Sequence, residues 1–166
     1  MIDLDITELF EEIVKELPEG LEILYPNGKG GTKVVKSPRL NYIFGSSQYI
    51  KDILDEYSKS SAQSERKFPL VALFTPISED RGDADYFSKA KVSLIIACSS
   101  CKEWSNEMRR TTSFKNILRP IYKRLLEVLY EDSRFDCDYD EKVKHSYSEN
   151  YSYGRYGAYT CLLYTS

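Results

Sequence analysis

The feature that most constrains the fold is an amphipathic segment over residues 113–129. Seven of its apolar side chains, from Phe114 to Leu129, recur at steps of three and four residues, so they share one face of an α-helix. That face needs an apolar surface to bury it. Two short β-prone runs, residues 70–74 and 92–97, are the best candidates. The pattern therefore predicts a long helix that packs on a sheet containing both runs.

A second amphipathic segment predicts a helix near the N-terminus. Asp5 or Thr7 can cap its start, and Pro18 and Gly20 end it. Several glutamates lie near its N-terminal end, where the helix dipole favours negative charge. The apolar stripe is formed by Ile6, Leu9, Phe10, Ile13, Val14 and Leu17.

Shorter patterns predict the remaining elements. Residues 21–25 and 41–44 have the character of strands, and residues 26–31 predict a hairpin turn or a flexible loop between strands. Ser46 or Ser47 can cap a helix that runs to about Tyr57. Residues 70–77 and 91–97 are expected to pair as antiparallel neighbours. Pro120 predicts either a late start or a kink in the long helix, and residues 143–160 predict one or two further strands.

The composition is that of one globular domain. The chain has 166 residues, of which 42% are hydrophobic and 30% charged. Its net charge of −3 gives no broad basic field, which argues against sequence-specific nucleic-acid binding. No apolar run reaches the roughly 18 residues that span a bilayer, and the acidic start is unlike a signal peptide. We therefore expect a cytoplasmic protein with no membrane contact, whose four cysteines are thiols.

The last six residues have a different origin in our interpretation. Residues 161–166 read like the translation of an adapter used in sequencing libraries. We therefore expect a single domain over residues 1–160, followed by a non-native C-terminal segment. The expected class is α+β, with a mainly antiparallel sheet packed on one face by two or three helices.

A pair of cysteines is the most conspicuous chemical motif. Cys98 and Cys101 follow a predicted strand with the spacing of a thioredoxin-like redox pair. The chain lacks the βαβ frame near its start that such a pair requires. Cys137 and His145 could complete a zinc site, but their spacing matches no compact zinc module. Two semi-buried thiols are the simpler interpretation.

Two charged segments are candidate subunit contacts. An acidic loop contains Asp80, Arg81, Asp83 and Asp85. Its three aspartates could also bind a hard cation, or the loop could simply be solvated. A basic cluster begins with Arg109 and Arg110 and continues along the long helix. It could contact an acidic surface of another subunit, or it could be the solvated side of the helix.

The order of these elements resembles that of phage tail terminator or tail completion proteins, which join heads to tails. The most specific pattern is F-x-x-I-L-x-P-I-Y-x-x-L-L over residues 114–126, which looks like the helix that packs on the sheet in that family. The first helix, the two apolar strands, the acidic loop and the segment from Trp104 to Arg110 also fit. Members finish with a further strand after a segment bearing Tyr and Gly, and by this resemblance that strand is missing here.

The resemblance implies a structural, non-enzymatic role without a cofactor. Such subunits form a ring, possibly a hexamer, that closes the head-proximal end of a phage tail. The implied partners are further copies of the chain, tail tube proteins and head–tail connector proteins, first in the host cytoplasm and then in the virion. Asp80, Arg81, Asp83, Asp85, Arg109 and Arg110 are the candidate interface residues. A neck or head–tail connector subunit is a related alternative, and a small thiol-dependent redox enzyme is the alternative from another class.

Overall fold

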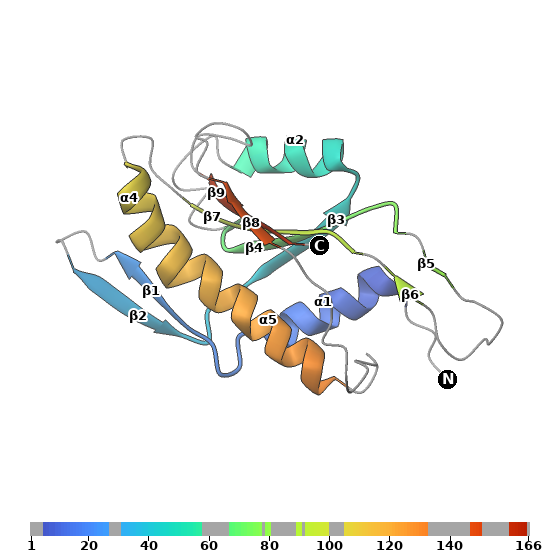
Figure 1. The fold of residues 1–166 in the computed structure, drawn as a ribbon, viewed down its shortest axis with the longest axis horizontal. Helices are drawn as coiled ribbons and strands as arrows, with labels where there is room; N and C mark the ends of the chain where they lie inside the picture. The colour runs from blue at the N-terminus through green and yellow to red at the C-terminus, as the bar shows by residue number, and fades with distance from the viewer. Residues whose placement is uncertain are drawn as a thin grey trace.

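The structure, a computed structural model, is shown in Figure 1. It describes residues 5–26, 31–57, 67–77, 79–80, 89–90, 92–99, 105–132, 147–150 and 160–165. These residues form helices and sheets of an α+β domain, so the expected class is confirmed.

A five-stranded sheet forms the centre of the molecule, in the order β3-β4-β7-β9-β8. Its strands are β3 (Asn41–Gly45), β4 (Leu70–Phe74), β7 (Leu94–Ser99), β8 (Tyr147–Asn150) and β9 (Thr160–Thr165). The β4–β7, β7–β9 and β8–β9 pairs are antiparallel, as expected of a mainly antiparallel sheet. The β3–β4 pair is parallel, because α2 (Ser47–Tyr57) carries the chain back between the two strands. Strand β4 lies between cis Phe68–Pro69 and Thr75–Pro76 bonds.

The first helix forms as its sequence predicts. Helix α1 spans Ile6–Glu16, and the Asp5 carboxylate caps it by accepting a hydrogen bond from the backbone N–H of Glu8 at 2.9 Å. After the helix, Gly20 adopts a φ of +79°, a conformation that glycine reaches without strain. In the apolar stripe, Ile6 and Leu9 are half-buried, and the other four residues, including Phe10 and Ile13, are buried.

A separate hairpin follows α1. Strands β1 (Glu22–Pro26) and β2 (Thr32–Lys36) pair antiparallel, which confirms the hairpin alternative for this segment. Ile23 faces inward and is fully buried, whereas Val34 on β2 is 53% exposed. One side of the hairpin thus packs its apolar side chains into the core beneath the long helix.

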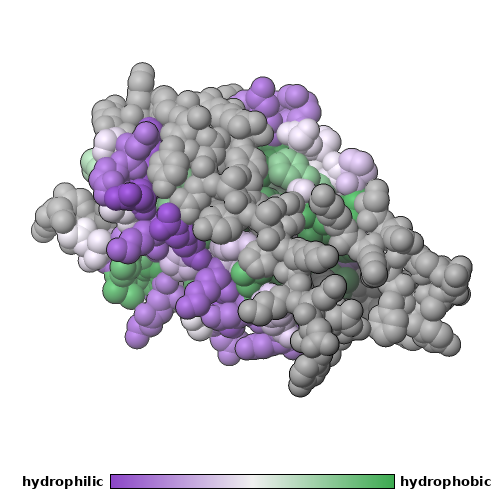
Figure 2. Space-filling view, viewed as in Figure 1, coloured by the Kyte–Doolittle hydropathy of each residue, from purple (hydrophilic) through white to green (hydrophobic). Residues whose placement is uncertain are grey.

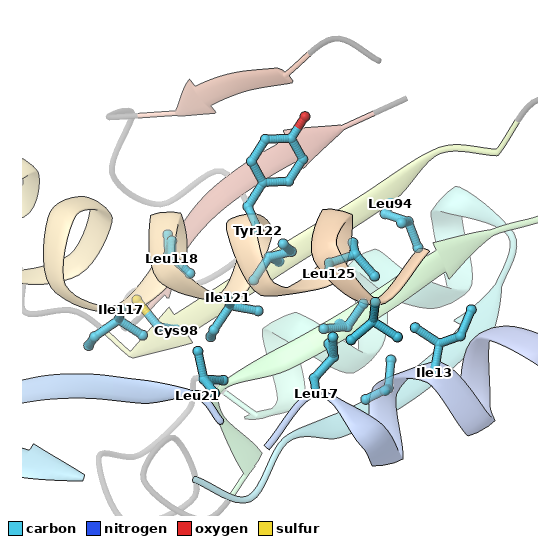
Figure 3. Packing of buried hydrophobic residues seen from close by; sticks show 14 of the residues in the cluster. Ile13, Leu17, Leu21, Leu94, Cys98, Ile117, Leu118, Ile121, Tyr122 and Leu125 are labelled. Atoms are coloured by element: carbon cyan, nitrogen blue, oxygen red, sulfur yellow. The ribbon is translucent and has the colours of Figure 1, made fainter. Parts of the chain in front are cut away.

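Two apolar clusters lie on opposite faces of the central sheet. Alternate residues of β4 divide between them: Val71 and Leu73 join one cluster, and Leu70 and Ala72 join the other. Helix α1 and the long helix cover the first face, as Figure 3 shows for Ile13, Leu118 and Leu125. Helix α2 covers the other face through Ile50 and Leu54. The sheet is therefore covered on two faces, where the sequence predicted helices on only one.

The long helix consists of three consecutive parts. It begins with one short turn, α4 (Asn106–Met108), continues as the π-helix η1 (Arg109–Leu118), and ends as α5 (Arg119–Glu131). Pro120 stands at the start of α5, where its missing N–H is best tolerated. The backbone N–H of Arg119 bonds to the carbonyl of Phe114, a step of five residues. A regular α-helix does start late, as one alternative predicted, but a helix of a different type precedes it.

The strand expected to be missing is present. Strand β9 pairs with β7 along six residue pairs and holds β8 on its other side. Five of its six residues belong to the segment that we expect to derive from an adapter. Strands β5 (Glu79–Asp80) and β6 (Lys89–Ala90) form a small separate ladder.

Candidate subunit interface

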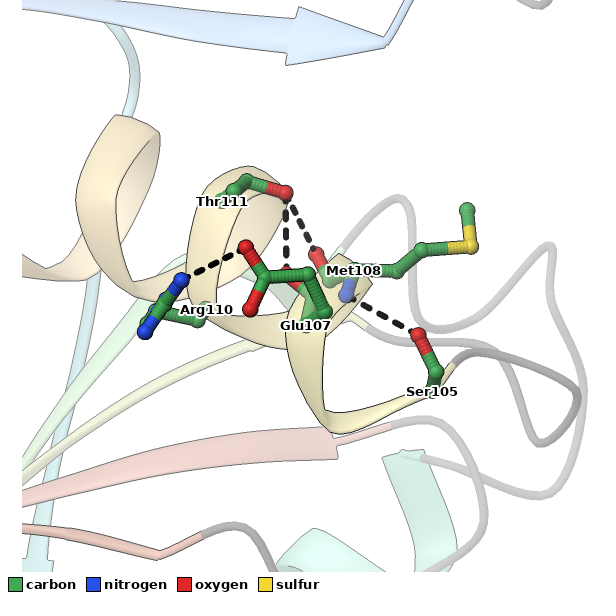
Figure 4. Close-up of polar contacts among 5 residues, drawn as sticks. All are labelled: Ser105, Glu107, Met108, Arg110 and Thr111. Atoms are coloured by element: carbon green, nitrogen blue, oxygen red, sulfur yellow. Dashed lines mark hydrogen bonds and ion pairs between the residues drawn. The ribbon is translucent and has the colours of Figure 1, made fainter.

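The N-terminal end of the long helix is held by local polar contacts. The Ser105 hydroxyl caps the helix by accepting a hydrogen bond from the Met108 N–H at 3.2 Å. The Glu107 carboxylate pairs with the Arg110 guanidinium at 2.6 Å, and the Thr111 hydroxyl donates to the Glu107 carbonyl at 3.0 Å (Figure 4). These contacts stabilise the first turns of the long helix.

Arg109 and Arg110, the two predicted interface arginines, differ in exposure. Arg109 is only 6% exposed and lies on the inner side of the helix, whereas the Arg110 side chain is 56% exposed. Arg110 is therefore the one of the pair that another subunit can reach. Arg109 supports the fold from within.

The π-helix explains why these two neighbours face opposite ways. Two turns of α-helix cover about seven residues, so α spacing counted back from Ile117 and Leu118 would turn Arg110 and Thr111 inward. The buried residues of η1 are instead Arg109, Ser113, Phe114, Ile117 and Leu118. Their recurring steps of four match the wider turn of a π-helix. The wider turn rotates Arg109 into the core and Arg110 out of it.

Four exposed cations follow one another along the outer side of the long helix. We call this set the basic stripe: Arg110, Lys115, Arg119 and Lys123. Figure 2 shows hydrophilic side chains along the diagonal that this helix occupies in Figure 1. Between Glu107 and Glu127 the helix contains no acidic residue. The stripe is thus a continuous positive surface rather than an alternation of signs.

Arg124 has a different role from the stripe. Its side chain is 20% exposed, and one guanidinium nitrogen lies 3.4 Å from Glu127. A Cβ added at Gly20 would be 3.8 Å from the Arg124 guanidinium carbon, so this group packs over the turn that follows α1. Arg124 therefore links the two helices within one molecule.

The acidic half of the predicted contact is described only in part. Asp80 lies in β5, where the backbone alone is described, and Arg81, Asp83 and Asp85 lie outside the described residues. In Figure 1 the β5–β6 ladder and α4 lie at opposite ends of the molecule. The described part of the acidic segment, the backbone of β5, is thus apart from the start of the long helix. A head-to-tail contact between copies joins two different surfaces of one chain in this way.

An acidic surface that was not among the predicted interface residues is present on α1. Glu8, Glu12 and Glu16 stand four residues apart, opposite the buried stripe, and we call them the acidic stripe. Glu8 and Glu16 are exposed, and Glu12 is half-buried. The available signal was the four-residue spacing of these glutamates; the sequence predicted Glu8 and Glu12 only as favourable charges near the start of the helix.

The cysteine motif is only partly described. Cys98 is 1% exposed and packs in the core near Ile117 and Ile121 (Figure 3), while Cys101 lies outside the described residues. A reactive thiol needs access to its substrate, which this position of Cys98 does not give. Cys137 and His145, the other possible zinc ligands, also lie outside the described residues.

The remaining titratable groups show structural roles. Burial raises the pKa of the Tyr25 and Tyr42 hydroxyls above the ordinary value, and the Tyr42 hydroxyl donates to the Thr7 carbonyl at 2.9 Å. In the described part of the chain, no three metal-ligating side chains come close enough to hold an ion. None of the helices described there combines the length and the hydropathy needed to cross a bilayer.

Comparison with known proteins gives no relative to guide the assignment. No protein-family model matches the chain, and no curated protein matches it.

Proposed function

We propose that this chain is a structural subunit of the tail-terminator type, which assembles into a ring that closes the head-proximal end of a phage tail. The supporting observation concerns the helix that carries the pattern F-x-x-I-L-x-P-I-Y-x-x-L-L. Its pattern residues Phe114, Ile117, Leu118, Ile121 and Leu125 are buried against the sheet, and its exposed side carries the basic stripe. One helix thus provides both a rigid core and a charged outer surface, which is the arrangement that a ring subunit needs.

The proposed partners follow from that role. Further copies of the chain form the ring, and tail tube and head–tail connector proteins contact it on either side. Assembly takes place in the host cytoplasm, and the ring then remains in the virion. The interface includes Arg110 and the acidic loop with Asp80, Arg81, Asp83 and Asp85. Arg109 contributes through the fold, because it is buried.

The direct test is the assembly state of the purified chain. Native mass spectrometry and electron microscopy are expected to show one closed ring of a fixed number of copies. A chain that stays monomeric at every concentration reached, or that forms open filaments, would overturn the proposal. The variant Arg110→Glu is expected to weaken the ring, and Lys51→Glu at an exposed position of α2, on the other face of the sheet, is a control with the same change in net charge. Equal assembly of both variants would remove Arg110 from the interface.

A further inference from the structure

The two outward-facing charged stripes of the helical layer complement each other. We propose that the basic stripe of one copy docks on the acidic stripe of α1 in a second copy. This contact rests on the proposed ring function and names the surface that its subunits use.

The two helices carry strong charges of opposite sign. Residues 5–19 contain six acidic side chains and one lysine, whereas residues 109–126 contain six basic side chains and no acid. The formal charges of the two segments are therefore −5 (one base, six acids) and +6 (six bases, no acid), whereas the whole chain carries only −3. Neither Lys115 nor Lys123 forms an ion pair within the described residues. Both ammonium groups are therefore available to a partner.

The spacing of the two stripes also matches. Glu8, Glu12 and Glu16 recur every four residues, and so do Lys115, Arg119 and Lys123. Four residues of α-helix rise about 6 Å, which is the interval within α1 and between Arg119 and Lys123. Lys115 lies in η1, so Arg119 and Lys123 are the pair that can meet two successive glutamates of α1 in register. Opposite charges at matched intervals fix the alignment of two surfaces more than they raise affinity.

Within one copy, α1 contacts α5 as well as β3 and β4, at one end of the strand order. The π-helical part of the long helix lies away from α1, because η1 contacts β7 and β9, toward the other end. A second copy placed beside the first along this direction brings its α1 toward the basic stripe. Such a contact joins different surfaces on the two copies, so it repeats around a ring if the rotation closes.

Nucleic acid is the other polyanion that a row of cations could bind. The net charge of −3 and the acidic stripe on the same helical layer repel a phosphate backbone. A protein helix with glutamates at the same spacing fits both the sign and the geometry. The observations therefore favour a second copy of this chain.

The test exchanges the charges of the two stripes. One variant carries Lys115→Glu and Lys123→Glu, and the other carries Glu8→Lys and Glu16→Lys. We expect each variant alone to associate at least about tenfold more weakly than the wild type, because its own two stripes now repel. In an equimolar mixture every stripe of one variant meets an opposite stripe of the other, so alternating assemblies should form. Sedimentation velocity of each protein and of the mixture measures this effect.

The controls separate the possible failures. The variant with all four substitutions should associate as well as the wild type, and far-ultraviolet circular dichroism should show the same fold for all. If the wild type assembles and neither variant is weakened, this contact is wrong while the ring proposal stands. If the wild type never assembles, the ring proposal itself is wrong. Binding of duplex DNA by the wild type that is lost with Lys115→Glu and Lys123→Glu, without restored assembly in the mixture, would overturn the contact in favour of a phosphate partner.

Discussion

Helix α1 and the long helix formed by η1 and α5 pack on the same face of the sheet, yet they differ in hydrogen-bonding pattern and in outer charge. Helix α1 is a regular, capped α-helix with an acidic outer side. The long helix passes through a π-helix before Pro120 and has a basic outer side. The apolar side chains on the inner sides of both helices nevertheless belong to one cluster. The core thus requires only an apolar stripe of the right length, whereas the outer sides are free to specify contacts.

The comparison is tested most strongly by removing one large side chain from the shared cluster. Phe114 is fully buried, so Phe114→Ala should lower the free energy of unfolding by about 3–5 kcal/mol. Ile13→Ala on α1 should cost about 2–5 kcal/mol, because the same cluster loses volume. Urea denaturation measures both. Tyr130→Ala is the control on the long helix, since Tyr130 is 42% exposed. A loss for Phe114→Ala no larger than for this control would show that the helix does not pack as described.

The two helices should also differ in how strongly a proline changes the free energy of unfolding. Glu11 lies in the middle of α1 with an exposed side chain, so Glu11→Pro should cost about 3 kcal/mol or more through the lost backbone hydrogen bond and the ring clash. Pro120→Ala should change stability by less than about 1 kcal/mol, because the proline stands where α5 begins. Thermal unfolding of both variants, with Glu11→Ala as the control, provides the measurement. A large effect of Pro120→Ala would mean that the proline itself maintains the π-helix.

Arg109 and Arg110 provide the third contrast. Arg109→Glu should cost about 2–3 kcal/mol, because it places a carboxylate in a buried position. Arg110→Glu loses only an exposed ion pair with Glu107, so its cost should stay below about 1 kcal/mol. Chemical denaturation at low and high salt separates the two. Equal losses would contradict the inward turn of Arg109.

Local periodicity was sufficient to predict much of the fold. The stripe of α1, the β1–β2 hairpin and the antiparallel β4–β7 pair all follow from patterns within a few residues. The parallel β3–β4 pair was not predicted, because it depends on where α2 returns the chain rather than on either strand. The same return of the chain places α2 over the second face of the sheet, so this packing was not predicted either. The continuous apolar character of β4, which suits a strand buried on two faces, was the available signal.

The candidate interface was less predictable for a physical reason. Counting at 3.6 residues per turn cannot reveal a π-helix, so the sequence could not show which of Arg109 and Arg110 faces inward. The same counting also misses Ser113, which η1 turns into the core; among the described residues its buried hydroxyl has no hydrogen-bond partner. The acidic stripe could have been predicted, because Glu8, Glu12 and Glu16 lie opposite an apolar stripe that was recognised. Its role as a contact could not be predicted, because the geometry of the long helix is what defines the basic stripe that it complements.

The caps at the two helix starts should differ in their dependence on pH, beginning with Ser105. Its hydroxyl accepts from the Met108 N–H and does not titrate, so Ser105→Ala should cost about 1 kcal/mol at every pH where the protein folds. Guanidinium denaturation from pH 7 to pH 3 measures the difference from the wild type. Ser105→Asp is the matched variant, because it keeps the cap but makes it ionisable. A cost for Ser105→Ala that vanished in acid would show that the cap acts through another group.

Replacing the Asp5 cap should change stability least of all these variants. Unlike the effect at Ser105, this change should depend on pH. Hydrogen bonds from the Thr7 hydroxyl and the Glu8 N–H lower the pKa of Asp5 below its ordinary value of 3.8. Because the pKa in the folded state lies below that in the unfolded chain, the contribution is fully present well above pH 3.8 and is lost as pH falls through the folded value. Asp5→Ser keeps a neutral cap, so the stability difference between wild type and variant should be constant near neutrality and should shift against the wild type in acid. Since Asp5 is fully exposed, the change should shrink further in high salt. A difference that stays constant down to pH 2, measured by denaturation at matched ionic strength, would show that the carboxylate is not ionised as the cap of α1, and would remove this contrast between the two helix starts.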